Sequence, residues 1–145
     1  MKSITLKIGV ACAVLLAGAL QAAAFDGVVV IVNKSVMVNS ISGVALKNIY
    51  TGRIMYWEDG QSIGPAVLAD NLDGKTDAAL EEVSGMDASQ FKTFWQRMLF
   101  SGRGQQPEKM DDVAALVAFV ASNKGAIALV PADADLKGVK KLEIK

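Results

Sequence analysis

The residues with the clearest chemical potential in this chain form the segment Asp73-Gly74-Lys75-Thr76. An apolar run over 63–69 comes before it and apolar residues at helical spacing come after it, so the segment is expected to open a helix. The first turn of a helix carries unpaired backbone N–H groups and the positive end of the helix dipole, which together favour an oxyanion. Thr76 adds a hydroxyl donor and Lys75 a positive charge. Gly74, Lys75 and Thr76 are therefore the first candidates for binding a small oxyanion.

Acidic residues surround this segment and oppose anion binding. Between positions 70 and 82, Lys75 is the single cation among five acids, which are Asp70, Asp73, Asp77, Glu81 and Glu82. Acids within a Debye length of roughly 8 Å repel an anion. Acids at a helix start are themselves stabilised by the helix dipole. An acidic helix start without a ligand is therefore the alternative interpretation.

Two other segments offer groups that suit an anion. The loop over 101–107 is rich in glycine, and Arg103 within it offers two guanidinium N–H groups to a carboxylate or phosphate. Ser35 follows the predicted strand over 27–33, at the end where ligands commonly meet parallel sheets. An ordinary loop after a helix and a plain strand exit are the alternatives. We keep Arg103 and Ser35 as assisting candidates.

Two familiar motifs fail on spacing around Gly74. A P-loop for nucleotide phosphates needs a glycine at position 69, where this chain has Ala69. An EF-hand calcium loop with Gly74 at its sixth position places Ala69 and Leu80 at positions that must bind the cation. Loose cation binding by the acidic loop over 70–73 stays open. We predict no dedicated metal site and no cofactor.

The composition argues against an enzyme. The chain has no histidine and one cysteine, which is Cys12. Ser-His-Asp catalysis, Cys-His catalysis and His-ligated zinc are therefore excluded. The carboxylates are scattered over loops and helix starts, so a glycosidase-type carboxylate pair is not indicated. We predict a protein that acts by reversible binding.

The N-terminal segment has the features of a secretory signal. Lys2 and Lys7 precede an apolar run over 8–20 that ends in Ala22-Ala23-Ala24. This run is shorter than the roughly 20 residues that a helix needs to cross a bilayer. We expect residues 1–24 to be removed on export, leaving residues 25–145 as a single domain in the periplasm without membrane insertion. An uncleaved anchor is the alternative.

Removal of Lys2 and Lys7 also makes the net charge of the protein slightly negative. It changes the formal net charge from +0 to about −2. A mature chain of this charge has no basic field for nucleic acid, which is therefore not an expected partner.

Strands and helices alternate along the rest of the chain. We predict strands over 27–33, 63–69, 126–130 and 141–144. Predicted helices run from Ser42 to Gly52, from near Thr76, from a capping box of Asp87 and Gln90, and over 111–122. This alternation predicts an α/β fold with a mixed, mostly parallel sheet flanked by helices.

Aromatic residues concentrate in one predicted helix and one turn. Side chains at helical spacing form an apolar stripe of Phe91, Phe94, Trp95, Met98 and Leu99. We predict that this stripe packs in the core. Trp57 is expected to cover the sheet edge beside the Asp59-Gly60 turn, with an exposed, ligand-stacking tryptophan as the alternative.

Several blocks in a fixed order resemble one known family. A strand ending in Val32-Asn33 is followed by a helix ending in Tyr50-Thr51-Gly52 and by a Trp-x-Asp-Gly turn. Later come Phe100-Ser101-Gly102-Arg103-Gly104 and a strand preceded by Lys124-Gly125. The set resembles the phosphate-binding proteins of bacterial ABC importers, and more closely their short, single-domain relatives among the type 2 periplasmic binding proteins. The similarity covers Val28 to Val130.

The resemblance implies one lobe of the type 2 periplasmic binding protein fold, with an anion site at the helix start near Thr76. In the phosphate binders a Ser-Gly-Thr stands there, with an arginine shortly before it. Here Gly74-Lys75 replaces Ser-Gly, and Asp70 stands near the arginine position. Of that motif, this chain keeps the threonine.

Two functions follow as hypotheses. The first is an exported, non-catalytic solute-binding-like protein that binds phosphate or another small oxyanion and works with an ABC permease or another envelope protein. The second is a one-lobe periplasmic scaffold or protein-interaction module that binds no small molecule and includes the case of a homodimer.

Overall fold

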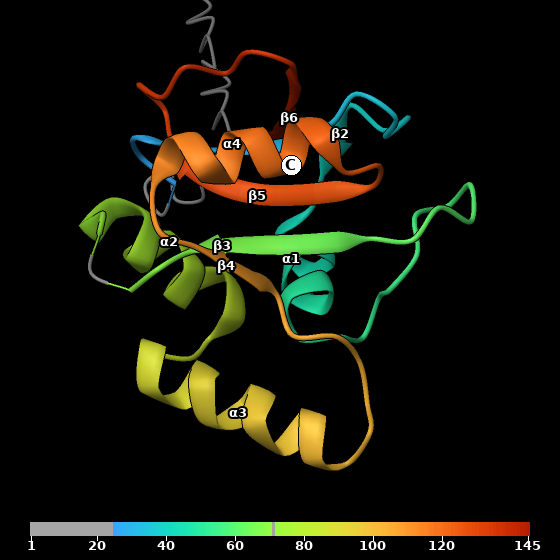
Figure 1. The fold of residues 1–145 in the computed structure, drawn as a ribbon, viewed down its shortest axis with the longest axis vertical. Helices are drawn as coiled ribbons and strands as arrows, with labels where there is room; N and C mark the ends of the chain where they lie inside the picture. The colour runs from blue at the N-terminus through green and yellow to red at the C-terminus, as the bar shows by residue number, and fades with distance from the viewer. Residues whose placement is uncertain (1–24, 71) are drawn as a thin grey trace, which may run out of the picture.

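The computed structural model describes residues 25–70 and 72–145. Their centre is a six-stranded sheet with the strand order β2-β6-β1-β5-β3-β4 (Figure 1). The strands are β1 (Val28–Asn33), β2 (Ser40–Ile41), β3 (Gly64–Leu68), β4 (Glu108–Met110), β5 (Ala126–Pro131) and β6 (Val139–Ile144). The helices are α1 (Gly43–Tyr50), α2 (Gly74–Ser84), α3 (Ala88–Phe100) and α4 (Val113–Ser122). The predicted α/β fold with a mixed sheet flanked by helices is confirmed.

The direction of β1 decides which loops lie at which end of the sheet. β3 is parallel to both β4 and β5, and β2 is parallel to β6. β1 is antiparallel to its two neighbours β5 and β6. The carboxyl end of β1 therefore lies at the same sheet end as the amino ends of β3 and β5. α2, which follows β3, begins at the opposite end.

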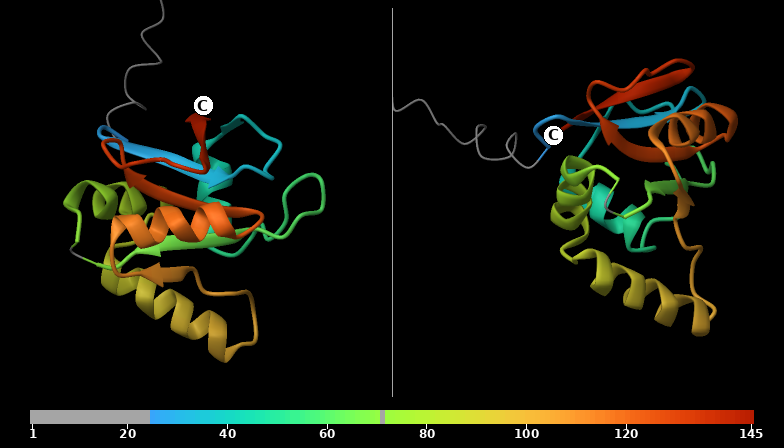
Figure 2. Two further views of the ribbon diagram at one scale, coloured as in Figure 1. Left: turned by 45° about the horizontal axis from the view of Figure 1, so that its top comes forward. Right: turned by 60° about the vertical axis from the view of Figure 1, so that its left-hand side comes forward.

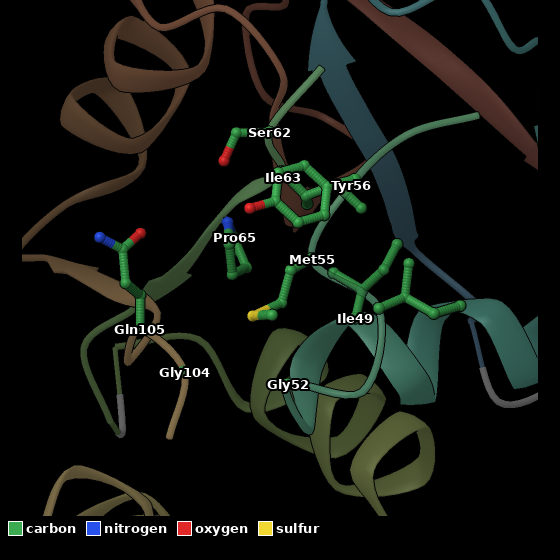
Figure 3. Close-up of a pocket in the computed structure, with 10 residues that line it drawn as sticks. Ile49, Gly52, Met55, Tyr56, Ser62, Ile63, Pro65, Gly104 and Gln105 are labelled. Carbon is green, nitrogen blue, oxygen red and sulfur yellow. The ribbon is translucent and has the colours of Figure 1, made fainter. Parts of the chain in front are cut away.

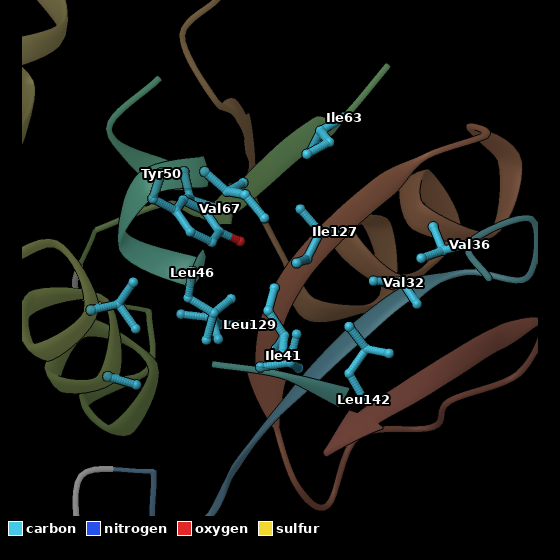
Figure 4. Close-up of a cluster of buried hydrophobic side chains, with 14 of the residues drawn as sticks. Val32, Val36, Ile41, Leu46, Tyr50, Ile63, Val67, Ile127, Leu129 and Leu142 are labelled. Carbon is cyan, nitrogen blue, oxygen red and sulfur yellow. The ribbon is translucent and has the colours of Figure 1, made fainter. Parts of the chain in front are cut away.

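Two apolar layers cover the two faces of the sheet. Side chains alternate along a strand, so neighbouring residues of β1, β3 and β5 contribute to different layers. One layer packs the sheet against α1 and α2 and includes Val32, Leu46 and Ile127 (Figure 4). The other packs it against α4 and includes Ile31 and Leu116. Figure 2 shows α3 outside this sandwich.

The helix starts follow the predicted capping residues. Ser42 accepts a hydrogen bond from the N–H of Ala45 at 3.1 Å and caps α1. Asp87 and Gln90 form the predicted capping box at the start of α3. Gly52 has a φ of 74° just after α1, as expected for a residue that ends a helix.

Two features depart from the predictions. The short edge strands β2 and β4 were not predicted, because two or three residues leave too little periodicity to recognise. The apolar stripe of α3 was predicted as core. Trp95 is buried and Phe91, Phe94 and Met98 are half-buried, whereas Leu99 is 50% exposed, so helical spacing overstated the burial at this end of the stripe. The predicted signal, residues 1–24, and position 71 lie outside the described residues.

Candidate functional site

The start of α2 is organised around Asp73. Its Oδ2 accepts a hydrogen bond from the backbone N–H of Thr76 at 2.9 Å and another from the Thr76 hydroxyl at 2.5 Å. Asp73 is thereby the N-cap of α2, and Thr76 is buried. The hydroxyl that Thr76 was predicted to offer to an oxyanion, and its backbone N–H, are therefore both directed at the protein's own carboxylate.

Gly74 and Lys75 remain exposed in the first turn of α2. The Lys75 side chain extends to the start of β1, since a β-carbon placed on Gly27 would lie 3.0 Å from its Nζ. Asp70, at the end of the β3 segment, pairs with Lys109 of β4 at 3.3 Å. This exposed ion pair contributes little to stability but offsets one acid of the segment.

Ser35 lies at the other end of the sheet from Thr76. Its hydroxyl donates to Gln61 Oε1 at 3.2 Å and accepts from the N–H of Gly125 at 3.1 Å. The expectation that Ser35 lies at the carboxyl ends of parallel strands is wrong, because β1 is antiparallel to both its neighbours. These contacts join the loop after β1 to the loops before β3 and β5.

Arg103 also lies away from the start of α2. Its backbone N–H donates to the carbonyl oxygen of Met98 at 3.0 Å, just after α3. The segment that contains it leads into β4, which is parallel to β3, so Arg103 precedes the amino end of β4. Of the five candidates, the structure brings together Gly74, Lys75 and Thr76, and it places Arg103 and Ser35 elsewhere.

Trp57 is fixed by a buried hydrogen bond. Its Nε1–H donates to the carbonyl oxygen of Gly125 at 2.9 Å, and the side chain is 9% exposed. The predicted structural role beside the Asp59-Gly60 turn is confirmed. A ligand-stacking role does not fit a buried indole.

A hollow of about 350 Å³ at the amino end of β3 was missed by the sequence reasoning. It lies between the loop after α1 and the segment that leads into β4 (Figure 3). Its wall includes Met55 and Tyr56, which are 48% and 60% exposed. The consecutive apolar residues Ile54, Met55 and Tyr56, just before the Trp57 turn, are the signal that could have marked it.

The described residues contain no group of three or more His, Cys, Asp or Glu side chains arranged to hold a metal ion. Within the same part of the chain, no helix combines the length and the apolar character that crossing a membrane requires. Burial raises the pKa of the Tyr50 hydroxyl, which donates a hydrogen bond to the carbonyl oxygen of Ala66 at 3.1 Å. This hydroxyl takes part in a hydrogen bond within the core and is not accessible to a ligand.

Comparison with known proteins identifies the superfamily of this chain. The family model described as the PBP superfamily domain matches residues 18–143. The chain belongs to the PBP superfamily. No curated protein sequence matches it.

Solved structures similar to this PBP superfamily member are larger binding proteins. One is a putative phosphate ABC transporter substrate-binding protein with bound phosphate from Clostridium perfringens, at 21% identity and a TM-score of 0.62, covering 81% of this chain and 44% of the other. A possible phosphate binding protein from Planctomyces limnophilus has 14% identity and a TM-score of 0.60, with coverage of 82% and 41%. An ABC-type phosphate transport receptor from Vibrio cholerae has 17% identity and a TM-score of 0.55, with coverage of 81% and 46%.

The chain therefore spans less than half the length of each of these three structures. At such identities the likeness shows the fold, and it confirms the resemblance to type 2 periplasmic binding proteins of the phosphate ABC transporter kind. Within that fold, the start of α2 is the segment where the candidates Gly74, Lys75 and Thr76 meet.

Proposed function

We propose that this chain is an exported, non-catalytic, solute-binding-like protein of the periplasm that recognises a small oxyanion, phosphate above all, at the start of α2. Membership of the PBP superfamily and the likeness to phosphate-binding structures support a binding role. The predicted signal at residues 1–24 supports export. An ABC permease, or another envelope protein, is the proposed partner.

The observation that carries the ligand class is the contact between Asp73 and Thr76. An oxyanion that reaches the exposed backbone N–H groups of Gly74 and Lys75 must lie beside the Asp73 carboxylate. A fully ionised anion is repelled there, whereas an anion that keeps a proton can donate a hydrogen bond to that carboxylate. Phosphate near neutral pH keeps at least one proton and sulfate keeps none. The site should therefore prefer phosphate to sulfate.

Calorimetry of the protein with phosphate and with sulfate tests this proposal. We expect phosphate to bind at least about tenfold more tightly than sulfate. Protonated phosphate gains a hydrogen bond to the Asp73 carboxylate, whereas sulfate is repelled by it. Asp73→Asn keeps an oxygen for the cap and replaces the other with an N–H donor, so it should strengthen sulfate binding and reduce the discrimination. Lys75→Ala should weaken both anions alike.

The control is Asp87→Asn, which makes the same change at the cap of α3, away from the start of α2. It should leave both affinities unchanged. No heat at millimolar phosphate, or equal affinity for the two anions in the unaltered protein, would contradict the proposal.

A one-lobe interaction module is the second candidate, and the end of α3 favours it. Phe100 is 95% exposed and the neighbouring Leu99 is 50% exposed. Neighbouring exposed apolar side chains are a feature of interaction surfaces where they form a contiguous patch. In this proposal a second copy of the chain covers the end of α3. Sedimentation should then show a mass that rises with concentration, and Phe100→Ser should abolish that rise.

A further inference from the structure

We infer that the hollow at the amino end of β3 is a second binding site, for a small uncharged molecule with an apolar body and a neutral hydrogen-bonding group. It is distinct from the proposed oxyanion site, because α2 begins beyond the carboxyl end of β3 while the hollow is lined by Ser62, Ile63 and Pro65 at its amino end. The two sites are separated by the length of that strand.

The size of the hollow fits a small ligand. Its volume of about 350 Å³ is at the lower end of the roughly 300–1,000 Å³ found for ligand pockets. The lining combines polar and apolar surface in similar amounts, and Ile49, Ile63 and Pro65 form part of its apolar side. Around them Ile54, Met55 and Tyr56 are 37%, 48% and 60% exposed, so a ligand here would cover apolar surface that now faces water.

Three neutral polar side chains line the same hollow. They are the hydroxyls of Tyr56 and Ser62 and the amide of Gln105. Within the described residues none of these three groups makes a hydrogen bond to the protein. Figure 3 shows the Tyr56 hydroxyl directed to the side of the hollow where Ser62 and Pro65 lie. Both donors and acceptors are thus available to a ligand that enters.

The walls of the hollow are held in place by Trp95. A β-carbon on Gly52 would lie 3.0 Å from Cη2 of this indole, and one on Gly104 would lie 3.4 Å from its Cζ3. Both glycines line the hollow, and both have a positive φ, of 74° and 73°. The loop after α1 and the segment before β4 therefore pack against the same buried side chain. A preformed wall reduces the ordering cost of binding.

Charge decides the ligand class. No charged side chain is among the residues that line the hollow. Arg53 and Arg103 adjoin the lining glycines in sequence, but both are exposed and neither lines the wall. An ion in the hollow would lose hydration without gaining a partner, whereas a neutral polar group keeps its hydrogen bonds.

The test is an NMR titration of the ¹⁵N-labelled protein, expressed from the full sequence, with benzamide, benzoate and benzylamine as probes. We expect benzamide to shift the backbone signals of the loop after α1 and of Gly104 and Gln105. The dissociation constant should be on the order of millimolar for a ligand of about nine non-hydrogen atoms. Benzoate and benzylamine should bind at least about fivefold more weakly. Tighter binding of benzoate than of benzamide would overturn the assignment of an uncharged ligand.

Variants separate the hollow from general surface binding. Tyr56→Phe and Gln105→Leu each remove one neutral polar group while keeping the apolar shape, and each should weaken benzamide roughly fivefold. The matched control is Met37→Ala, because Met37 is 77% exposed and does not line the hollow. Equal affinity of all three variants, or the absence of shifts at the hollow at tens of millimolar benzamide, would overturn the inference.

Discussion

The Nε1–H of Trp95 donates a hydrogen bond to the carbonyl oxygen of Tyr50 at 3.2 Å, and this contact joins α3 to the end of α1. Trp95 is the buried side chain of α3, and the half-buried Phe91 packs against the same core, so this indole is the main anchor of the helix. Phe91 and Phe94 add edge-on ring contacts to the same indole, with centroids 6.5 and 5.5 Å away. Trp95 is therefore both the anchor of α3 and the support of the hollow at the amino end of β3.

Replacing this anchor should destabilise the protein strongly. Trp95 is 1% exposed, so Trp95→Ala leaves a cavity and an unpaired carbonyl oxygen on Tyr50. We expect a loss of about 3 to 5 kcal/mol in the free energy of unfolding, measured by urea denaturation. The matched control on the same helix is Phe100→Ala. Phe100 is 95% exposed, so its loss should stay within about 0.5 kcal/mol. Similar losses for both variants would contradict the assignment of Trp95 as the anchor.

Gly125 should tolerate no side chain. A β-carbon there would lie 2.0 Å from the carbonyl oxygen of Ser62, and φ is 77°. The clash is with backbone, and moving it would break the hydrogen bond from Trp57 Nε1 to the Gly125 carbonyl oxygen. We expect Gly125→Ala to cost more than about 3 kcal/mol of unfolding free energy.

Gly60→Ala separates the clash at Gly125 from backbone strain. Gly60 has a φ of 84° with nothing within 4 Å of an added β-carbon. The control should therefore show the strain alone, at roughly 1 kcal/mol. A cost for Gly125→Ala no greater than that of the control would show that the loop before β3 can shift freely.

Asn33, at the end of β1, caps the carboxyl end of α4. Its Nδ2 donates to the carbonyl oxygens of Val120 at 2.8 Å and Ala121 at 3.0 Å, and the residue is 7% exposed. Asn33→Asp at pH 7 would point a carboxylate at those two carbonyl oxygens, at a cost of roughly 3 kcal/mol.

The same change at Asn123 is the control for Asn33. Its Nδ2 donates to Phe119 at 2.7 Å, but the site is exposed. Thermal unfolding should show less than about 1 kcal/mol for Asn123→Asp, since water can solvate the new charge. An equally small effect at Asn33 would mean that the end of α4 opens to solvent.

Local chemistry accounts for the parts of the fold that sequence could predict. The caps Ser42 and Asp87 and the strand β1 follow from short-range signals, namely a hydroxyl or carboxylate before an apolar period and a β-branched run. The direction of β1 does not follow, because antiparallel pairing with β5 and β6 is a property of strands far apart in the chain. Because β1 runs in this direction, Ser35 lies at the opposite end of the sheet from the start of α2.

The candidate site was predictable in place but not in detail. The start of α2 could be predicted from Gly74-Lys75-Thr76, but the orientation of the Asp73 carboxylate toward Thr76, on which the proposed choice of anion depends, could not. The hollow beside Tyr56 depends on Gly52 and Gly104 meeting the same indole. No local pattern reports a contact between segments so far apart in the chain.

The Tyr50 hydroxyl should make stability fall at high pH. Burial raises the pKa of this hydroxyl in the folded protein above its ordinary value of about 10. Above that pH the unfolded chain releases the proton while the folded protein keeps it, so the stabilisation is complete below about pH 10 and is lost as the pH rises further. One such proton changes the free energy of unfolding by about 1.4 kcal/mol per pH unit.

Tyr50→Phe should remove this part of the pH dependence. At pH 8 the variant should lose about 1 kcal/mol, because the hydrogen bond to the Ala66 carbonyl oxygen at 3.1 Å is gone. Between pH 10 and 11 its stability should fall less steeply than that of the unaltered protein, as urea denaturation at each pH would show. Tyr56→Phe removes an exposed hydroxyl and should keep the original slope. Parallel slopes for Tyr50→Phe and the unaltered protein would show that the Tyr50 hydroxyl does not cause the alkaline loss.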